Sequence, residues 1–346
     1  MGEEKTKVLL IENGLLGDYC ATAAVGQTLR KIFPGAQIAL LVKKTAGDFF
    51  ATSSWLDEIL FFDLPWTRVG FAQFALKLWI ELFFFSLRIR KLNFDYIVTT
   101  KRNFYQYILL FLLGGKKKFM PPRGAPVLYT ERALSVVREL GFTGKVNFAL
   151  EISNTSLDAA ENEIKNKKLE KNSFVIIHPG ASYILRRWYP AGFAELDILL
   201  SNRGIKIAYM GRGESDRIFM EQIGSLLNKE VIYFDLPLAV SIAVVSLSKA
   251  LIGMDSGFSH IAATLGIPTV ALYGPASARY TGITGPKVKM IDRHHLCTCH
   301  SRHLCIPYSS LTFCSLLRHT CKAMLGITPQ EVYMSVCEML GSPASK

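Results

Sequence analysis

Residues 250–275 read ALIGMDSGFSHIAATLGIPTVALYGP, and this stretch contains the pattern that decides the fold. Ala250–Met254 is a short apolar run, which predicts a buried strand, and Phe258–Leu265 has the apolar spacing of a helix. A glycine and a proline end that helix, and Thr269–Tyr273 is a second apolar run. The order strand, helix, strand predicts a βαβ unit with parallel strands.

The same alternation recurs along the whole chain. In the first half we predict a glycine-bearing loop at Asn13–Asp18, helices at Tyr19–Phe33 and Thr130–Leu140, and strands at Val8–Glu12, Gln37–Val42 and Tyr96–Thr100. In the second half we predict helices at Pro190–Arg203 and Ser215–Leu227 and a set of five strands at Phe174–His178, Ile205–Met210, Val231–Phe234, Ala250–Met254 and Thr269–Tyr273. This pattern predicts an α/β protein with two Rossmann-like, doubly wound domains facing across a cleft.

The length of 346 residues suits two domains of roughly 150 residues each. The polar run KNKKLEK at Lys165–Lys171 marks the boundary, so the predicted domains are residues 1–165 and 166–326. A terminal helix over Ile327–Leu340, within residues 327–346, is predicted to end the chain and can pack back on the first domain. Ligands of such sheets bind beyond the carboxyl ends of the strands, so functional residues are expected in the loops that follow them.

The charge balance indicates an anionic partner. Forty Lys and Arg against 28 Asp and Glu give a net charge of +12, which suits a phosphorylated substrate, an acidic membrane surface or nucleic acid. Nucleic acid is the least favoured of the three, because no basic stretch with interleaved aromatics forms a known binding module. The start MGEEKTKVLLIEN lacks a secretory signal, and we predict a cytoplasmic protein.

The longest apolar stretch, Val69–Leu87, is marginal in length for a bilayer-spanning helix and contains Lys77 and Glu81. Two alternatives remain for it. It is either a helix packed in the core or a helix at a membrane surface, where the basic residues of LRIRK would meet lipid phosphates. The second alternative predicts peripheral contact of segment 69–91 with a membrane.

The strand-to-helix turn at Asp255-Ser256-Gly257 is the first candidate for a binding site. Ser256 can cap the following helix, and Gly257 lets a ligand approach the main chain. The free N–H groups of a helix start favour an anion, whereas Asp255 would accept hydrogen bonds from hydroxyl groups. An ordinary capped turn is the alternative. A hydrolytic Ser256–His260–Asp255 set is disfavoured, since Ser256 is not centred in a G-x-S-x-G elbow and triads are assembled from distant segments.

Two other loops carry candidate residues. IENGLLGD contains Gly14, Gly17 and Asp18 but neither the G-x-G-x-x-G nor the G-K-[ST] spacing of nucleotide-binding loops. Asp18 starts a helix, so it either caps that helix or points its carboxylate into the cleft. HPGASYILRRWYP places Arg186 and Arg187 after a strand, where they can clamp a diphosphate or lie on the surface in solvent.

We predict that the reaction uses no metal and no cofactor. No D-x-D motif occurs, so the usual carboxylate pair for a nucleotide-bound divalent cation is missing. A group of cysteines and histidines near the C-terminus either binds zinc or an iron–sulfur cluster or has a local structural role, and its spacing lacks paired C-x-x-C. The cysteines are Cys297, Cys299, Cys305, Cys314, Cys321 and Cys337.

The motifs GLLGD, HPGAS…RRW, GRGE and GMDSGFSHIAATLGIPTVALYGP, in this order, resemble those of glycosyltransferase family 9, the lipopolysaccharide heptosyltransferases. The resemblance covers most of the chain. It implies a GT-B fold with an acceptor-binding first domain and a nucleotide-sugar-binding second domain. It also implies transfer from ADP-heptose to the lipopolysaccharide inner core or another anionic lipid-linked acceptor, with inversion and without a metal.

The resemblance also implies roles for single residues. Asp18 matches the family's general base, and Gly14 and Gly17 belong to the acceptor-side loop. Arg186 stands where relatives often have a lysine. The donor side comprises Arg186, Arg187, Glu214, Asp255, Ser256, Gly257 and His260, with Glu214 at the ribose and Asp255 at the sugar. A nucleotide-sugar epimerase or hydrolase, or a binding protein without catalysis, are the alternatives.

Overall fold

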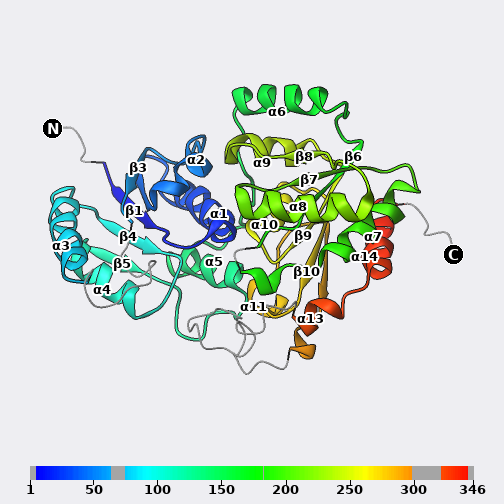
Figure 1. The fold of residues 1–346 in the computed structure, drawn as a ribbon. Helices are drawn as coiled ribbons and strands as arrows, with labels where there is room; N and C mark the ends of the chain where they lie inside the picture. The colour runs from blue at the N-terminus through cyan, green and yellow to red at the C-terminus, as the bar shows by residue number, and fades with distance from the viewer. Residues whose placement is uncertain (1–4, 64–74, 182, 298–320, 342–346) are drawn as a thin grey trace. The chain divides into compact units, whose positions relative to one another are not determined.

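The computed structural model describes residues 5–63, 75–181, 183–297 and 321–341 (Figure 1). The chain forms two compact units, Met1–Glu151 and Ile152–Lys346. The division lies earlier than the predicted boundary at residues 165 and 166. The physical reason is that helix α6 (Asn154–Asn166) packs against α9 (Leu238–Ser246) and therefore belongs to the second unit.

The first unit contains a five-stranded sheet in the order β3-β2-β1-β4-β5, in which every pair is parallel. Its strands are β1 (Lys7–Ile11), β2 (Gln37–Val42), β3 (Glu58–Phe61), β4 (Tyr96–Thr99) and β5 (Lys117–Phe119). Its helices are α1 (Leu16–Ile32), α2 (Gly47–Phe50), α3 (Ala75–Lys91), α4 (Phe104–Leu113) and α5 (Tyr129–Glu139).

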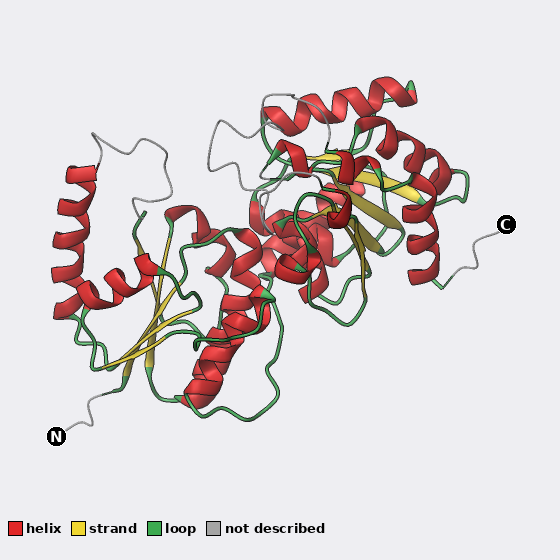
Figure 2. Ribbon diagram, turned by 90° about the horizontal axis from the view of Figure 1, so that it is seen from below, coloured by secondary structure: helices red, strands yellow, loops and turns green. Residues whose placement is uncertain are grey.

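Helices cover both faces of this sheet (Figures 1 and 2). Leu9 and Ile11 of β1 point to one face, where they share a buried cluster with Leu82 of α3 and Leu109 of α4. Val8 and Leu10 point to the other face because side chains alternate along a strand, and α1 and α5 pack together there. The near-continuous apolar run of β1 is therefore the pattern of a strand buried on both sides.

The second unit contains a six-stranded parallel sheet in the order β11-β10-β9-β6-β7-β8. Its strands are β6 (Phe174–His178), β7 (Lys206–Met210), β8 (Tyr233–Phe234), β9 (Ala250–Met254), β10 (Thr269–Tyr273) and β11 (Val288–Asp292). Its remaining helices are α7 (Pro190–Ser201), α8 (Glu214–Leu227), α10 (Gly257–Thr264), α11 (Ala278–Thr281), α13 (Lys322–Leu325) and α14 (Pro329–Met339).

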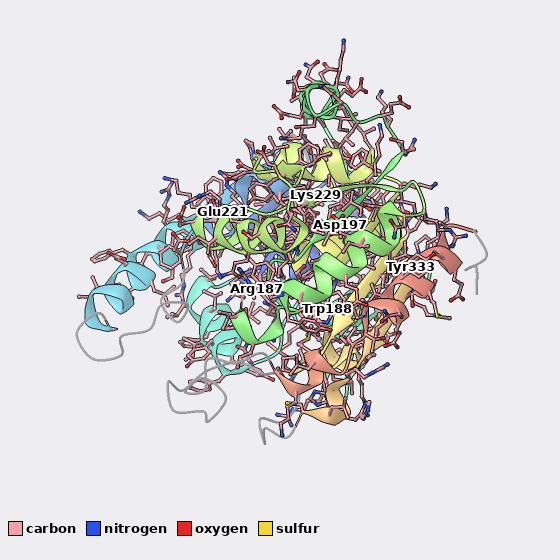
Figure 3. The ribbon with its side chains drawn as sticks, turned by 45° about the vertical axis from the view of Figure 1, so that its right-hand side comes forward. Arg187, Trp188, Asp197, Glu221, Lys229 and Tyr333 are labelled. Atoms are coloured by element: carbon pink, nitrogen blue, oxygen red, sulfur yellow. The ribbon has the colours of Figure 1, made fainter. Side chains whose placement is uncertain are left out.

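The second sheet is also buried on both faces. Val175 and Ile177 join a cluster with α7, α8 and α14, whereas Phe174 and Ile176 join one with α6 and α9. Trp188 is fully buried, and its indole N–H donates to the backbone carbonyl of Ile327 at 3.1 Å. Figure 3 labels Trp188 beside Arg187, and Asp197 and Tyr333 on the packed helices α7 and α14. The terminal helix α14 thus packs on α7 of its own unit.

Long apolar runs predicted their elements well, whereas three of the four edge strands, β3, β5 and β11, were missed. Four strands, β2, β6, β9 and β10, have the predicted bounds. The second sheet has six strands instead of the predicted five, because β11 carries the exposed residues of VKMID and lacks an apolar run. Strands β3 and β5 were also missed, and both are short and partly exposed. Helix α1 begins at Leu16, so Gly17 and Asp18 lie in its first turn and not in the predicted loop.

Part of the apolar stretch Val69–Leu87 lies outside the described residues; the described part forms α3 from Ala75 onward. Within the described parts of the chain, no helix combines the length and apolarity that crossing a bilayer requires. Cys299, Cys305 and Cys314 lie outside the described residues. Cys297, Cys321 and Cys337 lie within the described residues, and the Cys337 sulfur accepts an N–H of Arg203 at 3.2 Å.

Candidate functional site

Each sheet has one point at which the strand order reverses direction. In the first sheet this point lies between β1 and β4, and in the second between β6 and β9. Ligands of doubly wound sheets bind beyond the carboxyl ends of the strands at such a switch point. Polar and charged side chains gather at both of these points, and each cluster is described within its own unit.

The first cluster, which we call the Glu12 cluster, is formed by Glu12, Asp18 and Lys101. Ile11 pairs with Thr99 in register, so the residues that follow β1 and β4 emerge side by side. Glu12 directly follows β1, and Lys101 follows β4 by two residues. Their proximity is therefore a direct consequence of the sheet order, although the two residues are far apart in the sequence.

Glu12 is a completely buried acid whose oxygens are fully engaged. Its carboxylate accepts hydrogen bonds from the hydroxyls of Thr22 and Thr100, both at 2.7 Å, and from the Tyr129 hydroxyl at 3.1 Å. Lys101 Nζ lies 3.2 Å away. Burial opposes ionisation of Glu12, but the charge of Lys101 and the hydrogen bonds outweigh it and lower its pKa. Glu12 therefore stays an anion that fixes Lys101.

Lys101 in turn holds Asp18. Its Nζ lies 2.8 Å from Asp18 Oδ2, and the same oxygen accepts the backbone N–H of Leu15 at 2.9 Å. Burial disfavours the charge of Lys101, but Asp18 and Glu12 outweigh that effect and raise its pKa. The side chain of Asp18 is 25% exposed to solvent, whereas that of Glu12 is not exposed at all. Asp18 is thus the acid of this cluster that a ligand can reach.

Gly14 lies against all three charged groups. A Cβ at this position would lie 1.8 Å from Asp18 Oδ2, 2.1 Å from Lys101 Nζ and 2.6 Å from Glu12 Oε1. We expect Gly14→Ala to displace the cluster and lower the free energy of unfolding by about 1–3 kcal/mol, measured by urea unfolding. Gly35→Ala is the matched control because nothing lies within 4 Å of its added methyl. Equal stability of the two variants would contradict the tight packing around Gly14.

The second cluster contains two ion pairs between arginines and acids. Arg186 Nη1 lies 2.9 Å from Asp255 Oδ2, and both side chains are at most one-tenth exposed. Arg187 Nη2 lies 2.6 Å from Asp216 Oδ1, and the Arg187 guanidinium also lies over the ring of Phe219. Both predicted arginines are therefore held by carboxylates in the structure, and neither lies free on the surface.

His178 ends β6 between these ion pairs. Its Nδ1 lies 3.3 Å from the hydroxyl of Ser256, which precedes α10. A Cβ on Gly180 would lie 3.1 Å from His178 Nε2 and 3.2 Å from Asp216 Oδ2, so the main chain passes closely here. Ser256 occupies the N-cap position of α10, but its side chain makes no capping hydrogen bond, which corrects the predicted capping role. Its hydroxyl lies beside His178 instead.

Burial lowers the pKa of His178 to about 4, against an ordinary value of 6.5. Because the folded pKa lies below the unfolded one, this residue contributes stability above pH 6.5 that is lost as the pH falls toward 4. Between pH 7 and pH 5 we expect the wild type to lose about 2 kcal/mol more unfolding free energy than His178→Asn. Urea unfolding of both proteins at both pH values measures this. An identical loss in both would contradict a buried neutral imidazole.

The structure brings some of the predicted donor-site residues together and leaves Glu214 in a separate, exposed ion pair. Asp255, Ser256 and Gly257 lie together with Arg186 and His178, and His260 lies one turn into α10. Glu214 lies exposed at the first residue of α8 and pairs with Arg217, which lowers its pKa through a side-chain hydrogen bond. No three His, Cys, Asp or Glu side chains among the described residues are arranged to hold a metal ion.

Sequence reasoning missed four residues of these clusters. They are Glu12, Lys101, His178 and Asp216. A signal existed for three of them, because an ionisable residue directly follows an apolar run in LLIEN, ends one in VIIHP and stands two residues after the strand in IVTTK. Asp216 has no such signal, since the sequence GRGESD offers two acids and only the structure shows that the second is the one that pairs with Arg187.

Comparisons with known proteins agree on one family. The model of "Glycosyltransferase family 9 (heptosyltransferase)" matches residues 100–307, more than half of the chain. Lipopolysaccharide heptosyltransferase 1 from Pseudomonas aeruginosa is 20% identical over 298 residues, which cover 81% of both sequences.

Two solved structures share the fold of this chain. The glycosyl transferase family 9 protein from Veillonella parvula matches with a TM-score of 0.78 at 17% identity over 98% of both chains. Escherichia coli ADP-heptose lps heptosyltransferase II matches with a TM-score of 0.73 at 18% identity, over 97% of this chain and 98% of that one. The predicted α/β class with two Rossmann-like doubly wound sheets of the GT-B type is confirmed.

Proposed function

Because this chain belongs to glycosyltransferase family 9, we propose that it transfers a heptose from ADP-heptose to the lipopolysaccharide inner core or a related lipid-linked acceptor. The observation that carries the proposal is the Glu12 cluster, in which a reachable carboxylate is held by a partly buried lysine at a switch point. The names of the similar proteins support the sugar and the acceptor.

In the proposed reaction the second unit binds the donor. Arg186 and Arg187 offer guanidinium groups to the diphosphate, and the start of α10 at Ser256 and Gly257 adds main-chain N–H groups and a helix dipole. These positive groups stabilise the charge that develops on the leaving diphosphate, so the proposed step needs no metal. Asp255 accepts hydrogen bonds from sugar hydroxyls, His260 borders the diphosphate, and Glu214 contacts the ribose.

Asp18 acts as the general base in the first unit, with Gly14 and Gly17 forming the acceptor-side loop. It takes the proton of the attacking acceptor hydroxyl as the bond from the anomeric carbon to the diphosphate breaks. Attack on the face opposite the leaving group inverts the anomeric centre in one displacement. Lys101 keeps Asp18 charged and in place, and general-base help of this kind contributes about 10²–10⁴-fold to the rate.

The acceptor is anionic and carried by a lipid, which agrees with the net charge of +12. We place the protein in the cytoplasm, in peripheral contact with the inner membrane. Incubating the purified chain with ADP-heptose and truncated lipopolysaccharide tests the proposal, and a heptosylated acceptor is the expected product. Release of sugar without acceptor product would instead indicate a hydrolase or epimerase. Tight ADP binding without any turnover would indicate a binding protein.

Replacing Arg187 tests the donor site. We expect Arg187→Met to weaken ADP binding by about 10- to 100-fold, because charge-assisted hydrogen bonds to a phosphate are lost. Isothermal titration with ADP measures the effect. Arg138→Met is the matched control, since Arg138 is an exposed arginine on α5 of the other unit. Equal affinities of the two variants would remove Arg187 from the diphosphate site.

A further inference from the structure

Helix α3 exposes an apolar stripe that the proposed reaction does not use. Ile80, Phe83, Phe84 and Leu87 recur at the spacing of one helix face, and Phe83 and Phe84 are 51% and 64% exposed. The opposite side of the helix is buried through residues such as Leu82, which packs against the sheet. The helix is therefore apolar on its outer side as well as its inner side.

Helix α4 has a second stripe of the same kind. Phe104, Tyr107 and Phe111 share one face, and Phe104 and Phe111 are 72% and 73% exposed. Leu109 and Leu113 lie buried on the inner side. Large aromatic rings with most of their surface in water are unfavourable in a soluble protein unless a partner covers them.

The two stripes belong to one surface. Helices α3 and α4 pack against each other on the same side of the first sheet (Figures 1 and 2). Arg90 fixes the contact, because its Nε donates to the carbonyl of Leu112 at 2.7 Å and its Nη2 to that of Phe111 at 3.0 Å. We call the two stripes together the aromatic face; its members are Ile80, Phe83, Phe84, Leu87, Phe104, Tyr107 and Phe111.

Basic residues border the aromatic face. Arg88 and Lys91 continue the α3 stripe toward the end of the helix, and both are exposed. Lys118 follows α4 and is also exposed, whereas Lys117 points to the other face of the sheet, over the ring of Tyr96. Glu81 is the one acidic residue in the sequences of α3 and α4. This combination of aromatic rings and positive charge is complementary to a bilayer surface with anionic headgroups.

We propose that the aromatic face docks the protein on an anionic lipid bilayer. The rings of Phe83, Phe84, Phe104 and Phe111 enter the boundary between headgroups and acyl chains, and Arg88 and Lys91 meet the lipid phosphates. The proposal rests on the proposed function for its purpose, since docking would bring the enzyme to a lipid-linked acceptor. The charged border favours lipid over a second copy of this chain, whose own face would carry the same charges.

Flotation of the full chain with vesicles tests this docking without any sugar substrate. We expect binding to phosphatidylcholine vesicles that contain one third phosphatidylglycerol, weak binding to pure phosphatidylcholine, and release by salt. The double variant Phe84→Ser/Phe111→Ser should bind the vesicles at least about 10-fold more weakly than the wild type. Arg88→Gln/Lys91→Gln should bind roughly 25-fold more weakly, because each basic residue near the membrane contributes about fivefold. Leu226→Ser, an exposed apolar position of α8, should bind like the wild type.

Unchanged binding of both double variants, or no binding of the wild type, would overturn the proposal. A change from dimer to monomer in the Phe variant, without a loss of vesicle binding, would also overturn it and indicate a protein interface. The two proposals fail separately. Lost vesicle binding with intact transfer to a soluble acceptor counts against docking alone, and intact binding without transfer counts against the proposed activity alone.

Discussion

Asp18→Asn is expected to lower the turnover of heptosyl transfer by about 10²–10⁴-fold while ADP binding stays unchanged. The amide has nearly the same shape as the carboxylate and still accepts the N–H of Leu15, but it cannot take the acceptor's proton. The donor groups lie in the other unit and keep their ion pairs. Steady-state transfer assays and ADP titration measure the two quantities.

Asp48→Asn is the matched control, because Asp48 is an exposed acid at the start of another helix of the same unit. It should retain full turnover. Full activity in Asp18→Asn would remove Asp18 from the role of base. A loss of ADP binding in the same variant would show that the substitution disturbs more than proton transfer, and the unfolding midpoint would distinguish a damaged fold from a damaged site.

The sequence predicts the parts of the site that are local. The turn Asp255-Ser256-Gly257 is recognisable because an apolar strand precedes it and a helical pattern follows it, and the structure places it between β9 and α10. The arginines after β6 are recognisable for the same reason. Such signals depend on neighbours within a few residues, and those neighbours are visible in a single sequence.

The partners of these residues are not local, and a single sequence does not show them. Lys101 meets Asp18 across 83 residues because β4 is the strand that lies beside β1. Arg187 meets Asp216 across 29 residues because β6 and β7 are neighbours. Strand order selects the partner, and strand order depends on the packing of the whole sheet. The position of the arginines after a strand could therefore be predicted from the sequence, whereas their carboxylate partners could be identified only in the structure.

Lys101→Met is expected to lower the free energy of unfolding by about 3 kcal/mol at pH 7, since it leaves the buried Glu12 charge without its cation. This figure is at the lower end for a broken buried pair, because the Lys101 side chain keeps 21% of its exposure. Methionine preserves the apolar stem, so most of the loss is electrostatic. Chemical unfolding of both proteins measures it, and a loss below about 1 kcal/mol would contradict a buried pair.

The pH dependence of this loss identifies its origin. In the wild type the lowered pKa of Glu12 contributes stability above its ordinary value of 4.5, and that contribution is lost as the pH falls. Without the charge of Lys101 the pKa of Glu12 rises, so protonation relieves the penalty. The difference between Lys101→Met and the wild type should therefore shrink as the pH falls below about 5.

The double variant Lys101→Met/Glu12→Gln should recover part of the lost unfolding free energy at pH 7, because the neutral amide needs no cation. If the losses of the two single variants simply add in the double variant, the two charges do not act on each other.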